Sequence, residues 1–444
     1  MTDRIASKLE DLAAAQFDTG RKAAGERSCP VSRLGAGFRP FAAAYLQEPH
    51  EFLRNARRDE PVFYSPEIDH WVVTRYQDVK SVFQDPATFS AANTLSAVTP
   101  MPPRVLQQLR DGGFRMNPVL TNLDPPEHQR IRKHVSNAFS ARRIAEAEPW
   151  IRSMINDYID RLESGPVHAD GFRHADMVEA FAYELPAYVV FRLMGVPDDQ
   201  VANVKAWTKN RVALTWGRCT EEQQMREVAG LISMWKLCER LVEAQVAQQD
   251  PTFLGALAGF HLERPDELSV NEIESILFTM LVAGHETTTN AIANGLHFLL
   301  GERVHWELLC QHAGHIPAAV EEILRLRAPV TSWRRVATKA TVLGGQSISA
   351  GDRVLLMLAS ANHDDAKFPD PEAFQIERRN ARENLAFGFG AHQCIGASLA
   401  RLELKLVIEQ LAQRMAGIAL DVPQQFSYPL NLSFCGPAAL RVHW

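Results

Sequence analysis

The chain has 444 residues, of which 46% are hydrophobic and 23% are charged, and its formal net charge is −6. This mildly acidic balance argues against a nucleic-acid-binding surface, which would concentrate basic residues. The sequence has no apolar run of about 18 residues, so we expect no membrane span. Its six cysteines form no CxxC pairs, which disfavours a zinc knuckle or a disulfide framework and indicates a reducing, cytoplasmic compartment.

The N-terminal region is polar and charged, without the apolar core of a signal peptide. We expect residues 1–35 to form a partly disordered tail. No linker, repeat or block of like charge divides the remainder of the chain, although its length exceeds that of most single domains. We therefore expect residues 36–444 to form one domain.

Two short strand patterns, at residues 61–64 and 70–74, alternate with helical patterns in the segment 38–89. This mixture predicts a small sheet subdomain. The following segment, 90–122, is rich in Pro, Gly and small residues and has few periodic apolar positions. It predicts a long mobile connection of the kind that covers a pocket.

Helical periodicity dominates from residue 126 to residue 326. The longest candidate helix covers 269–300, where one buried face is marked by Ile273, Ile276, Met280, Ala283 and Thr287. After Arg327 the pattern changes to short β segments, including a strand at 354–358. A helix is expected from Ile395 to about Met415, and a few strands follow it. The fold class is therefore mainly α with a minor β portion.

The most informative segment is the glycine-rich loop that ends at Cys394. A lone cysteine is more often a small buried hydrophobe than a ligand, so its surroundings must carry the argument. This cysteine stands directly before a helix, where backbone N–H groups and the helix dipole favour thiolate. Gly388, Gly390 and Gly396 permit turns that let the loop wrap the sulfur closely. The loop is suited to a metal-bound thiolate.

The loop reads Phe-Gly-x-Gly-x-His-x-Cys-x-Gly from Phe387 and is followed by Ala-Ser-Leu-Ala-Arg-Leu-Glu. This run closely resembles the haem-binding signature of the cytochrome P450 family. The resemblance implies the cytochrome P450 fold, a haem b cofactor (iron protoporphyrin IX) and Cys394 as the iron ligand, with Phe387 and Gly388 against the cofactor. It also implies a monooxygenase, which inserts one atom of O2 into an organic substrate.

A second motif, Ala-Gly-His-Glu-Thr-Thr, begins at Ala283 in the long helix. In most helices such a threonine only bonds back to a carbonyl one turn earlier. Here Ala283 and Gly284 remove bulk on the face that carries Thr287, so a flat ligand could approach. The run resembles the family's oxygen-activation motif, which implies that Glu286 delivers protons and that Thr287 hydrogen bonds the bound oxygen, with an ordered water between them. His285 occupies the motif's variable position, and a structural or solvent-linked role is expected for it.

The resemblance also implies two sets of anchoring residues. Glu322 and Arg325 match the family's Glu-x-x-Arg, and Arg378 matches the third member of that buried ionic network. The four residues that match propionate-binding positions are His128, Arg132, Arg335 and His392, with Arg334 as a rival to Arg335. One departure is visible, because Ala-Asn-His-Asp stands at 361–364 where the family often has Ala-Asn-Arg-Asp. It puts the local packing of that segment in doubt.

By family position, five segments should line the substrate pocket: 90–122, 211–216, 280–283, 330–333 and 433–434. Their residues are mainly apolar or small, with no clustered charge, so we expect an uncharged aromatic or aliphatic substrate of modest size. The expected reaction is hydroxylation or O-dealkylation.

The electrons should come from a partner. Residues 215–218 and 332–335 resemble a bacterial subgroup whose haem domain is often fused to a flavin and iron–sulfur reductase. We expect electrons from NAD(P)H through such a reductase, fused or separate, or through a ferredoxin. Two alternatives stay open, a hydrogen-peroxide-driven peroxygenase and a non-catalytic haem-binding sensor. The acid and alcohol of Glu286 and Thr287 argue against both.

Overall fold

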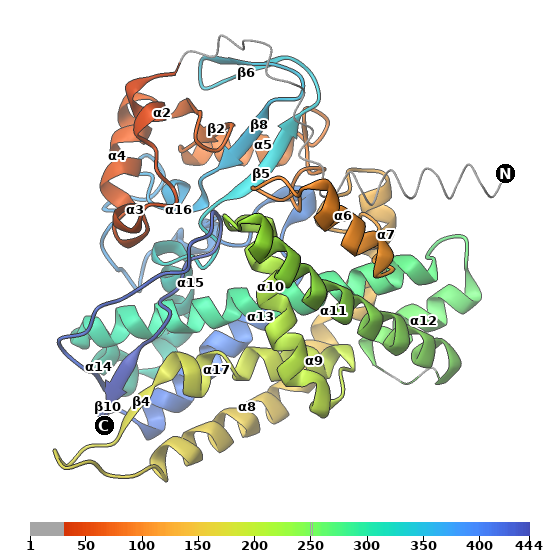
Figure 1. Cartoon of the computed structure of the whole chain (residues 1–444). Coiled ribbons are helices and arrows are strands. Elements are labelled where there is room, and N and C mark those ends of the chain that lie inside the picture. Colours follow the sequence, from red (N-terminus) through yellow and green to blue (C-terminus); the bar gives the residue numbers. More distant parts are fainter. Residues whose placement is uncertain (1–30, 249, 251) are drawn as a thin grey trace.

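The computed structural model describes residues 31–248, 250 and 252–444, and Figure 1 shows a small sheet-containing part above a larger helical part. The expected tail lies outside the described residues up to residue 30. The short helix α2 (Arg33–Gly37) begins within the last residues of the predicted tail, and the Ser32 hydroxyl accepts a hydrogen bond from the Gly35 amide at its start.

The small part is built around a five-stranded sheet in the order β1-β2-β8-β5-β3. β2 runs parallel to β8 and the other neighbours are antiparallel. The strands predicted near 61–64 and 70–74 are confirmed, and the strand predicted at 354–358 ends at Leu356. The strands are β1 (Val62–Ser65), β2 (His70–Val73), β3 (Phe89–Ser90), β5 (Trp333–Ala337) and β8 (Arg353–Leu356), and the helices of this part are α2, α3 (Ala43–Gln47), α4 (His50–Asp59), α5 (Tyr76–Gln84) and α16 (Leu358–Ala361).

The segment 90–122 is not the unstructured connection that its composition predicts. It contains helix α6 (Pro103–Asp111), whose Val105 and Leu109 are buried in the main core. Proline at the first helical position and apolar residues four apart are helix signals that the Pro and Gly content concealed. Leu95 and Met116, on either side of α6, are also buried in that core.

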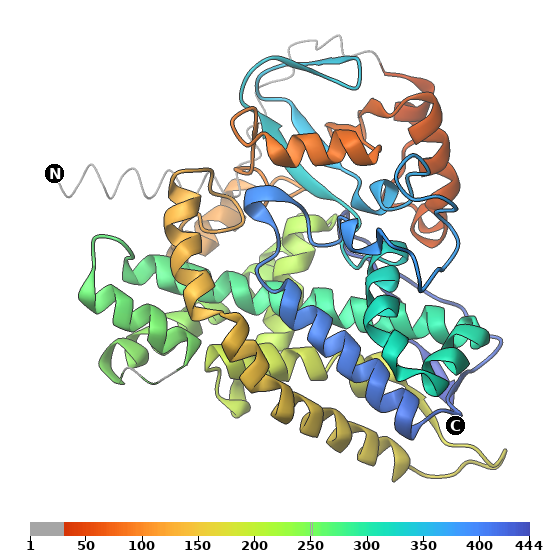
Figure 2. The ribbon, with the colours of Figure 1, turned by 180° about the vertical axis from the view of Figure 1, so that it is seen from behind.

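The helical part surrounds α13 (Val270–Gly301), which is longer than any other helix in the described part of the chain. Ser269 and Glu272 form a capping box that fixes the start of this helix. α13 packs against α9, α10, α11 and α17, and it crosses the centre of the molecule in Figures 1 and 2. The helical part comprises α7 (Glu127–Ala138), α8 (Ala141–Glu163), α9 (Leu185–Met194), α10 (Val201–Trp216), α11 (Glu221–Gln248), α12 (Phe253–Glu263), α13, α14 (Arg303–Gln311), α15 (Ile316–Leu326) and α17 (Ala397–Arg414).

Small sheets complete the fold. β6 (Thr341–Leu343) and β7 (Gln346–Ile348) form a hairpin, and β4 (His174–Asp176), β10 (Arg441–His443) and β9 (Ala419–Leu420) form a three-stranded sheet near the C-terminus. The class predicted from the sequence, mainly α with a minor β portion, is confirmed. Within the described residues, every helix is too short or too polar to cross a membrane.

Candidate active site

The loop that carries Cys394 lies between the sheet part and α17, and its backbone is held by its own hydrogen bonds. The Cys394 amide donates to the Phe387 carbonyl over 2.9 Å. Gly388 and Gly390 have φ angles of +66° and +71°, which residues with a Cβ rarely adopt. A Cβ on Gly390 would also lie 2.9 Å from the Phe83 carbonyl oxygen. Gly396 has an ordinary φ of −83°, so the turn does not require glycine there.

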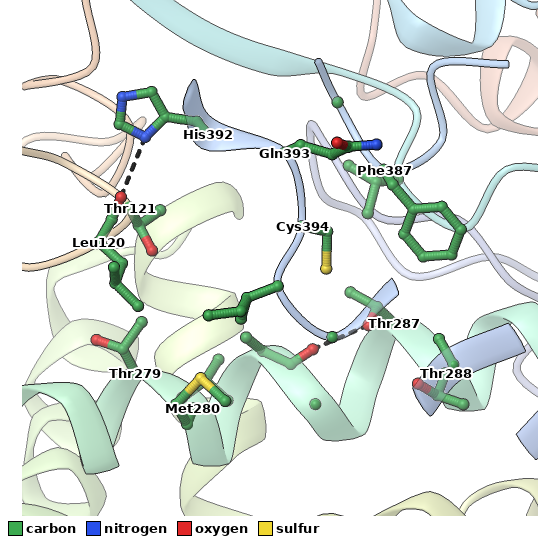
Figure 3. Close-up of a pocket in the computed structure, with 18 of the residues that line it drawn as sticks. Leu120, Thr121, Thr279, Met280, Thr287, Thr288, Phe387, His392, Gln393 and Cys394 are labelled. Atoms are coloured by element: carbon green, nitrogen blue, oxygen red, sulfur yellow. Dashed lines mark hydrogen bonds between the residues drawn. The ribbon is translucent and has the colours of Figure 1, made fainter. Parts of the chain in front are cut away.

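The sulfur of Cys394 points into a cavity, as Figure 3 shows, and α13 forms the opposite wall. Burial raises the pKa of the Cys394 thiol, and it outweighs the opposing effects of hydrogen bonds from the Gly396 and Ala397 amides and of the charges of Arg132 and Arg401. The amides of Gly396 and Ala397 favour thiolate, as the sequence predicts, while desolvation opposes them, although Cys394 is exposed to the cavity. A metal ion bound at the sulfur would favour the thiolate further.

The α13 wall carries Ala283 and Thr287, which both line the cavity. The Thr287 hydroxyl donates to the Ala283 carbonyl over 2.9 Å (Figure 3), the back-bonding common for threonine in helices. Gly284 also lines the cavity, but a Cβ built there would lie 2.5 Å from Val190 Cγ2 on α9. Glycine at 284 therefore serves the packing of α13 against α9, and its expected role in the approach of a flat ligand stays a prediction.

Glu286 does not line the cavity, although it is the neighbour of Thr287. Consecutive helical residues face different directions, and Glu286 lies close enough to Tyr183 and to Lys209 of α10 for their charges to interact. Burial raises the pKa of Glu286, against the opposing charge of Lys209. Its Oε1 atom is buried with no hydrogen-bond partner among the described residues.

His285 is fully buried between α13 and its neighbours. Its ring nitrogens lie 3.2 Å from the Thr208 hydroxyl and 3.2 Å from the Tyr183 carbonyl. Burial lowers the pKa of His285 to about 3, so the ring is neutral at pH 7. These contacts agree with the structural role that was expected for His285.

The four residues predicted to bind propionates come together from α7, β5 and the cysteine loop. The rings of His128 and His392 are 4.1 Å apart, and Arg132 donates to the Gln393 carbonyl over 2.6 Å. Arg335, which is 2% exposed, is close enough to lower the pKa of His392. Arg132 and His392 line the cavity, while His128 and Arg335 do not.

Both ring nitrogens of His128 and the Nε2 atom of His392 are buried without a hydrogen-bond partner among the described residues. Burial and neighbouring guanidinium groups lower the pKa of His128 to about 4 and that of His392 to about 3. Both rings are therefore neutral at pH 7, and each carries one N–H. The N–H of His392 lies on Nδ1, which donates to the Leu120 carbonyl over 3.1 Å, whereas the N–H of His128 has no partner among the described residues. Arg132 and Arg335 carry the positive charge.

Arg334 has a different function from Arg335 in the structure. Its guanidinium group donates to the Ser96 carbonyl over 2.6 Å and to the Thr94 carbonyl over 2.8 Å. It thereby ties the segment before α6 to β5. The geometry places Arg335, and not its rival, beside the two histidines.

A buried ionic network supports the segment before the cysteine loop. Glu322 accepts two hydrogen bonds of 2.8 Å from Arg325 and one of 2.8 Å from Arg378. Arg325 also donates to the carbonyls of Asn362 and Pro371. The network expected from the sequence is present, and it joins α15 to the irregular chain that leads to Cys394.

The substitution of histidine at 363 is accommodated locally. His363 Nδ1 lies 2.8 Å from the Ala359 carbonyl, and the ring packs 4.3 Å from that of His50. Asn362 beside it accepts the Leu385 amide over 2.7 Å. The Asn362 Nδ2 and His363 Nε2 atoms, in contrast, are buried without a hydrogen-bond partner among the described residues.

The cavity lining includes residues from all five predicted segments. Sequence reasoning missed Phe83 of α5 and Glu403 of α17, whose patterns are those of ordinary core and helix-surface positions. It also judged the lining to be without clustered charge. The lining residues from the five segments include one charged side chain, Arg211, and Arg334, whose pKa is lowered in part by that charge, does not line the cavity.

The comparisons with known proteins identify the family. A family model described as cytochrome P450 matches residues 44–307 and 311–416. The cytochrome P450 monooxygenase PikC of Streptomyces venezuelae is 34% identical over 422 residues, which are 94% of this chain and 95% of that protein. The chain belongs to the cytochrome P450 family and is a P450 monooxygenase.

Comparison with solved structures shows which members of the family this chain resembles. Cytochrome P450 CREJ in complex with (4-ethylphenyl) dihydrogen phosphate has a TM-score of 0.88 and 36% identity, with coverage of 92% of this chain and 100% of that chain. An intact type IV self-sufficient cytochrome P450 monooxygenase also has a TM-score of 0.88 and 36% identity, with coverage of 94% and 54%. The resemblance to haem domains of the self-sufficient subgroup is confirmed.

Haem is the cofactor that this membership implies, and the site fits it in three respects. The cavity passes between the Cys394 sulfur and α13. Buried nitrogens of His128 and His392 remain without partners among the described residues, next to Arg132 and Arg335. Most of the other lining residues are apolar, as a porphyrin ring requires. The roles of the individual residues stay predictions.

Proposed function

We propose that this monooxygenase inserts one oxygen atom into a small to medium organic substrate with an apolar body, by hydroxylation or O-dealkylation. In a hydroxylation, one C–H bond becomes C–OH, and the second oxygen atom leaves as water after uptake of two electrons and two protons. The observation that carries the proposal is the Cys394 sulfur facing an apolar cavity whose far wall holds Thr287. Bound haem iron would supply the binding and reductive activation of O2.

The chain's own residues would hold the cofactor. Cys394 would ligate the iron as thiolate, and neutral His128 would donate its free N–H to a haem carboxylate. His392 already donates its Nδ1–H to the Leu120 carbonyl, so its Nε2 atom would donate to a haem carboxylate in the protonated form of the ring, which a neighbouring carboxylate favours. Arg132 and Arg335 would neutralise the carboxylate charge, since buried carboxylates need paired cations. Ala283 would leave room for the ring on the α13 side.

Protons would reach the cavity through α13. Burial raises the pKa of Glu286, so this carboxyl takes up a proton more readily than an exposed glutamate does, on the side of Lys209. Thr287 would accept a proton from it and present its hydroxyl to the cavity. Because the two side chains face different directions, a water between them would complete the path.

The electron source and compartment follow from relatives and composition. We propose that electrons come from NAD(P)H through a flavin and iron–sulfur reductase, fused or separate, or through a ferredoxin. The similarity to an intact self-sufficient enzyme supports a reductase of this type. The relative crystallised with (4-ethylphenyl) dihydrogen phosphate supports an alkyl-aromatic body for the substrate. Scattered cysteines support a cytoplasmic location.

The reduced protein with carbon monoxide provides the test. Wild type should show the Soret band at the long wavelength characteristic of thiolate-ligated haem, and Cys394→Ala should lose it. Persistence of the band in Cys394→Ala would contradict the assignment. Turnover with NAD(P)H and a reductase, compared with hydrogen peroxide alone, separates the monooxygenase from a peroxygenase, and no turnover with either would indicate a sensor.

A further inference from the structure

A group of metal-ligating side chains lies in the small sheet-containing part, away from the cavity. One ring nitrogen of His50, one of His363 and a carboxylate oxygen of Glu372 lie within 4.8 Å of one another. His50 begins α4 and His363 follows α16, and these two helices pack against each other (Figure 1). None of the three residues lines the cavity, so the group is separate from the proposed site of oxygen activation.

His363 is oriented as a metal ligand by its own surroundings. Its Nδ1 atom donates to the Ala359 carbonyl over 2.8 Å, which places the hydrogen on Nδ1 and the lone pair on Nε2. The residue is 1% exposed, and its Nε2 atom is buried without a hydrogen-bond partner among the described residues. Metal-binding histidines commonly have this arrangement, in which the second ring nitrogen is held by a carbonyl.

Glu372 and His50 complete the group. The Glu372 Oε2 atom lies 3.8 Å from His363 Nε2, too far for a hydrogen bond, while Oε1 accepts from Arg54 over 3.0 Å. The ring centroids of His50 and His363 are 4.3 Å apart. Zinc needs its donor atoms about 3.3 Å apart, because Zn–N and Zn–O bonds are about 2.0–2.2 Å long. Small rotations of His50 and Glu372, which are less buried than His363, would close the remaining distance.

Positive charge around the group opposes a bound cation and sets an upper limit on its affinity. Arg327 donates to His50 Nε2 over 3.1 Å, and Arg54 pairs with Glu372. Arg327 and Arg54 are both exposed, so solvent and salt screen their charges. Arg327 can also turn into water when a metal ion takes its place at His50. The expected affinity is therefore lower than that of a buried structural zinc site.

We propose that His50, His363 and Glu372 bind a divalent transition-metal ion of the zinc type, with water as the fourth ligand. Two imidazoles and one carboxylate suit zinc, whereas Mg²⁺ and Ca²⁺ prefer oxygen ligands. The carbonyls on either side of Glu372 accept from Arg325 of the buried ionic network. The bound ion would therefore join α4 to the segment that leads to the cysteine loop. It takes no part in oxygen activation.

The test measures zinc binding to the untagged protein by calorimetry at pH 7.5. The protein is loaded with haem first, so that Cys394 and the histidines beside the cavity do not compete for zinc. We expect one zinc ion per chain with a dissociation constant of about 10 μM or lower, and no comparable binding of Mg²⁺. The melting temperature should rise with zinc concentration, because an ion that binds only the folded chain stabilises it.

His50→Gln and Glu372→Gln each remove one ligand at a position that is not fully buried. Each should weaken zinc binding about 10- to 100-fold or more and abolish the rise in melting temperature. Arg327→Gln should act in the opposite direction and tighten zinc binding about threefold or more, because it removes a nearby positive charge and the competing hydrogen bond to His50. The matched control is His174→Gln, since both ring nitrogens of His174 already contact aspartate carboxylates. It should bind zinc as wild type does.

Two results would overturn the proposal. The first is adventitious surface zinc only, shown by binding that is unchanged in both His50→Gln and Glu372→Gln. The second is failure of wild type to bind zinc with a dissociation constant below about 100 μM. Either ligand variant decides the question by itself when its circular dichroism spectrum matches that of wild type. Weaker zinc binding in Arg327→Gln would contradict a metal ion at His50.

Discussion

Two buried polar clusters in this protein differ in how their hydrogen bonds are completed. In the network of Glu322, Arg325 and Arg378, the carboxylate and the guanidinium groups are matched by one another and by backbone carbonyls. Around the cavity, His128 and His392 have buried nitrogens that no described residue satisfies. Both clusters are made of residue types that are costly to bury.

The difference teaches which buried polar groups serve the fold and which serve a ligand. An unsatisfied buried donor costs about 1–3 kcal/mol, so several of them gathered beside one cavity indicate a ligand that would satisfy them. The network is complete in the chain itself, and it fixes the segment that leads to Cys394. The group of His128, His392, Arg132 and Arg335 beside the cavity leaves hydrogen-bonding nitrogens without partners among the described residues. A cofactor with two carboxylates would supply those partners.

The largest effect is expected for Glu322→Ala, which leaves two buried guanidinium groups without their carboxylate. We expect the free energy of unfolding to fall by about 3–5 kcal/mol, measured by chemical denaturation at pH 7.5. The control is Glu146→Ala, which breaks the exposed pair between Arg142 and Glu146 and should cost about 0.5 kcal/mol or less. Similar losses in both variants would show that the buried network stabilises the fold no more than an exposed ion pair does.

In contrast to Glu322→Ala, His128→Leu is expected to change stability little and to weaken haem binding. Removal of two unsatisfied nitrogens should leave the free energy of unfolding of the haem-free protein within about 1 kcal/mol of wild type. The same change should speed haem transfer to an acceptor globin by about tenfold or more, since a carboxylate partner is lost. A strong loss of stability without faster haem loss would show that His128 serves the fold.

Thr287→Ala tests the α13 wall without a change in buried charge. We expect product formed per reductant consumed to fall severalfold, because the hydroxyl no longer delivers a proton to the cavity. Peroxide-driven turnover should survive better. The comparison requires product and reductant to be quantified in the same reaction, and unchanged coupling would argue against the relay.

The smallest effect is expected for Glu403→Gln, and it depends on pH. Burial raises the pKa of Glu403, so the folded protein keeps a proton that the unfolded chain releases above about pH 4.5. Stability contributed by this group therefore falls as pH rises above that value. Glutamine does not titrate, so the Glu403→Gln variant does not lose stability in this way as pH rises. Its melting temperature should be about 1–2 °C above that of wild type at pH 7.5 and equal to it near pH 4.5. Thermal unfolding between pH 4.5 and 8 would measure it, and a variant that melts lower at pH 7.5 would show that the carboxylate is paired.

Much of the fold could be predicted because its signals are local. The two strands of the N-terminal sheet, the long helix α13 and the turn before α17 follow from alternation, helical periodicity and glycine placement. α6 was missed because Pro and Gly around it suggested a loop, while the buried Val105 and Leu109 gain their stability from packing against distant helices. The composition of a segment does not indicate which distant residues will pack against it.

The sequence by itself determined the family and the members of both buried clusters, and it predicted Cys394 as the iron ligand, since these depend on residue type and spacing. Only the tertiary structure decided where their side chains point. It turned Glu286 away from the cavity, placed Val190 against Gly284, raised the pKa of Cys394 by burial and brought Arg211 beside Arg334. The physical reason is that electrostatic and steric effects act through distances between residues far apart in the chain, and folding alone sets those distances.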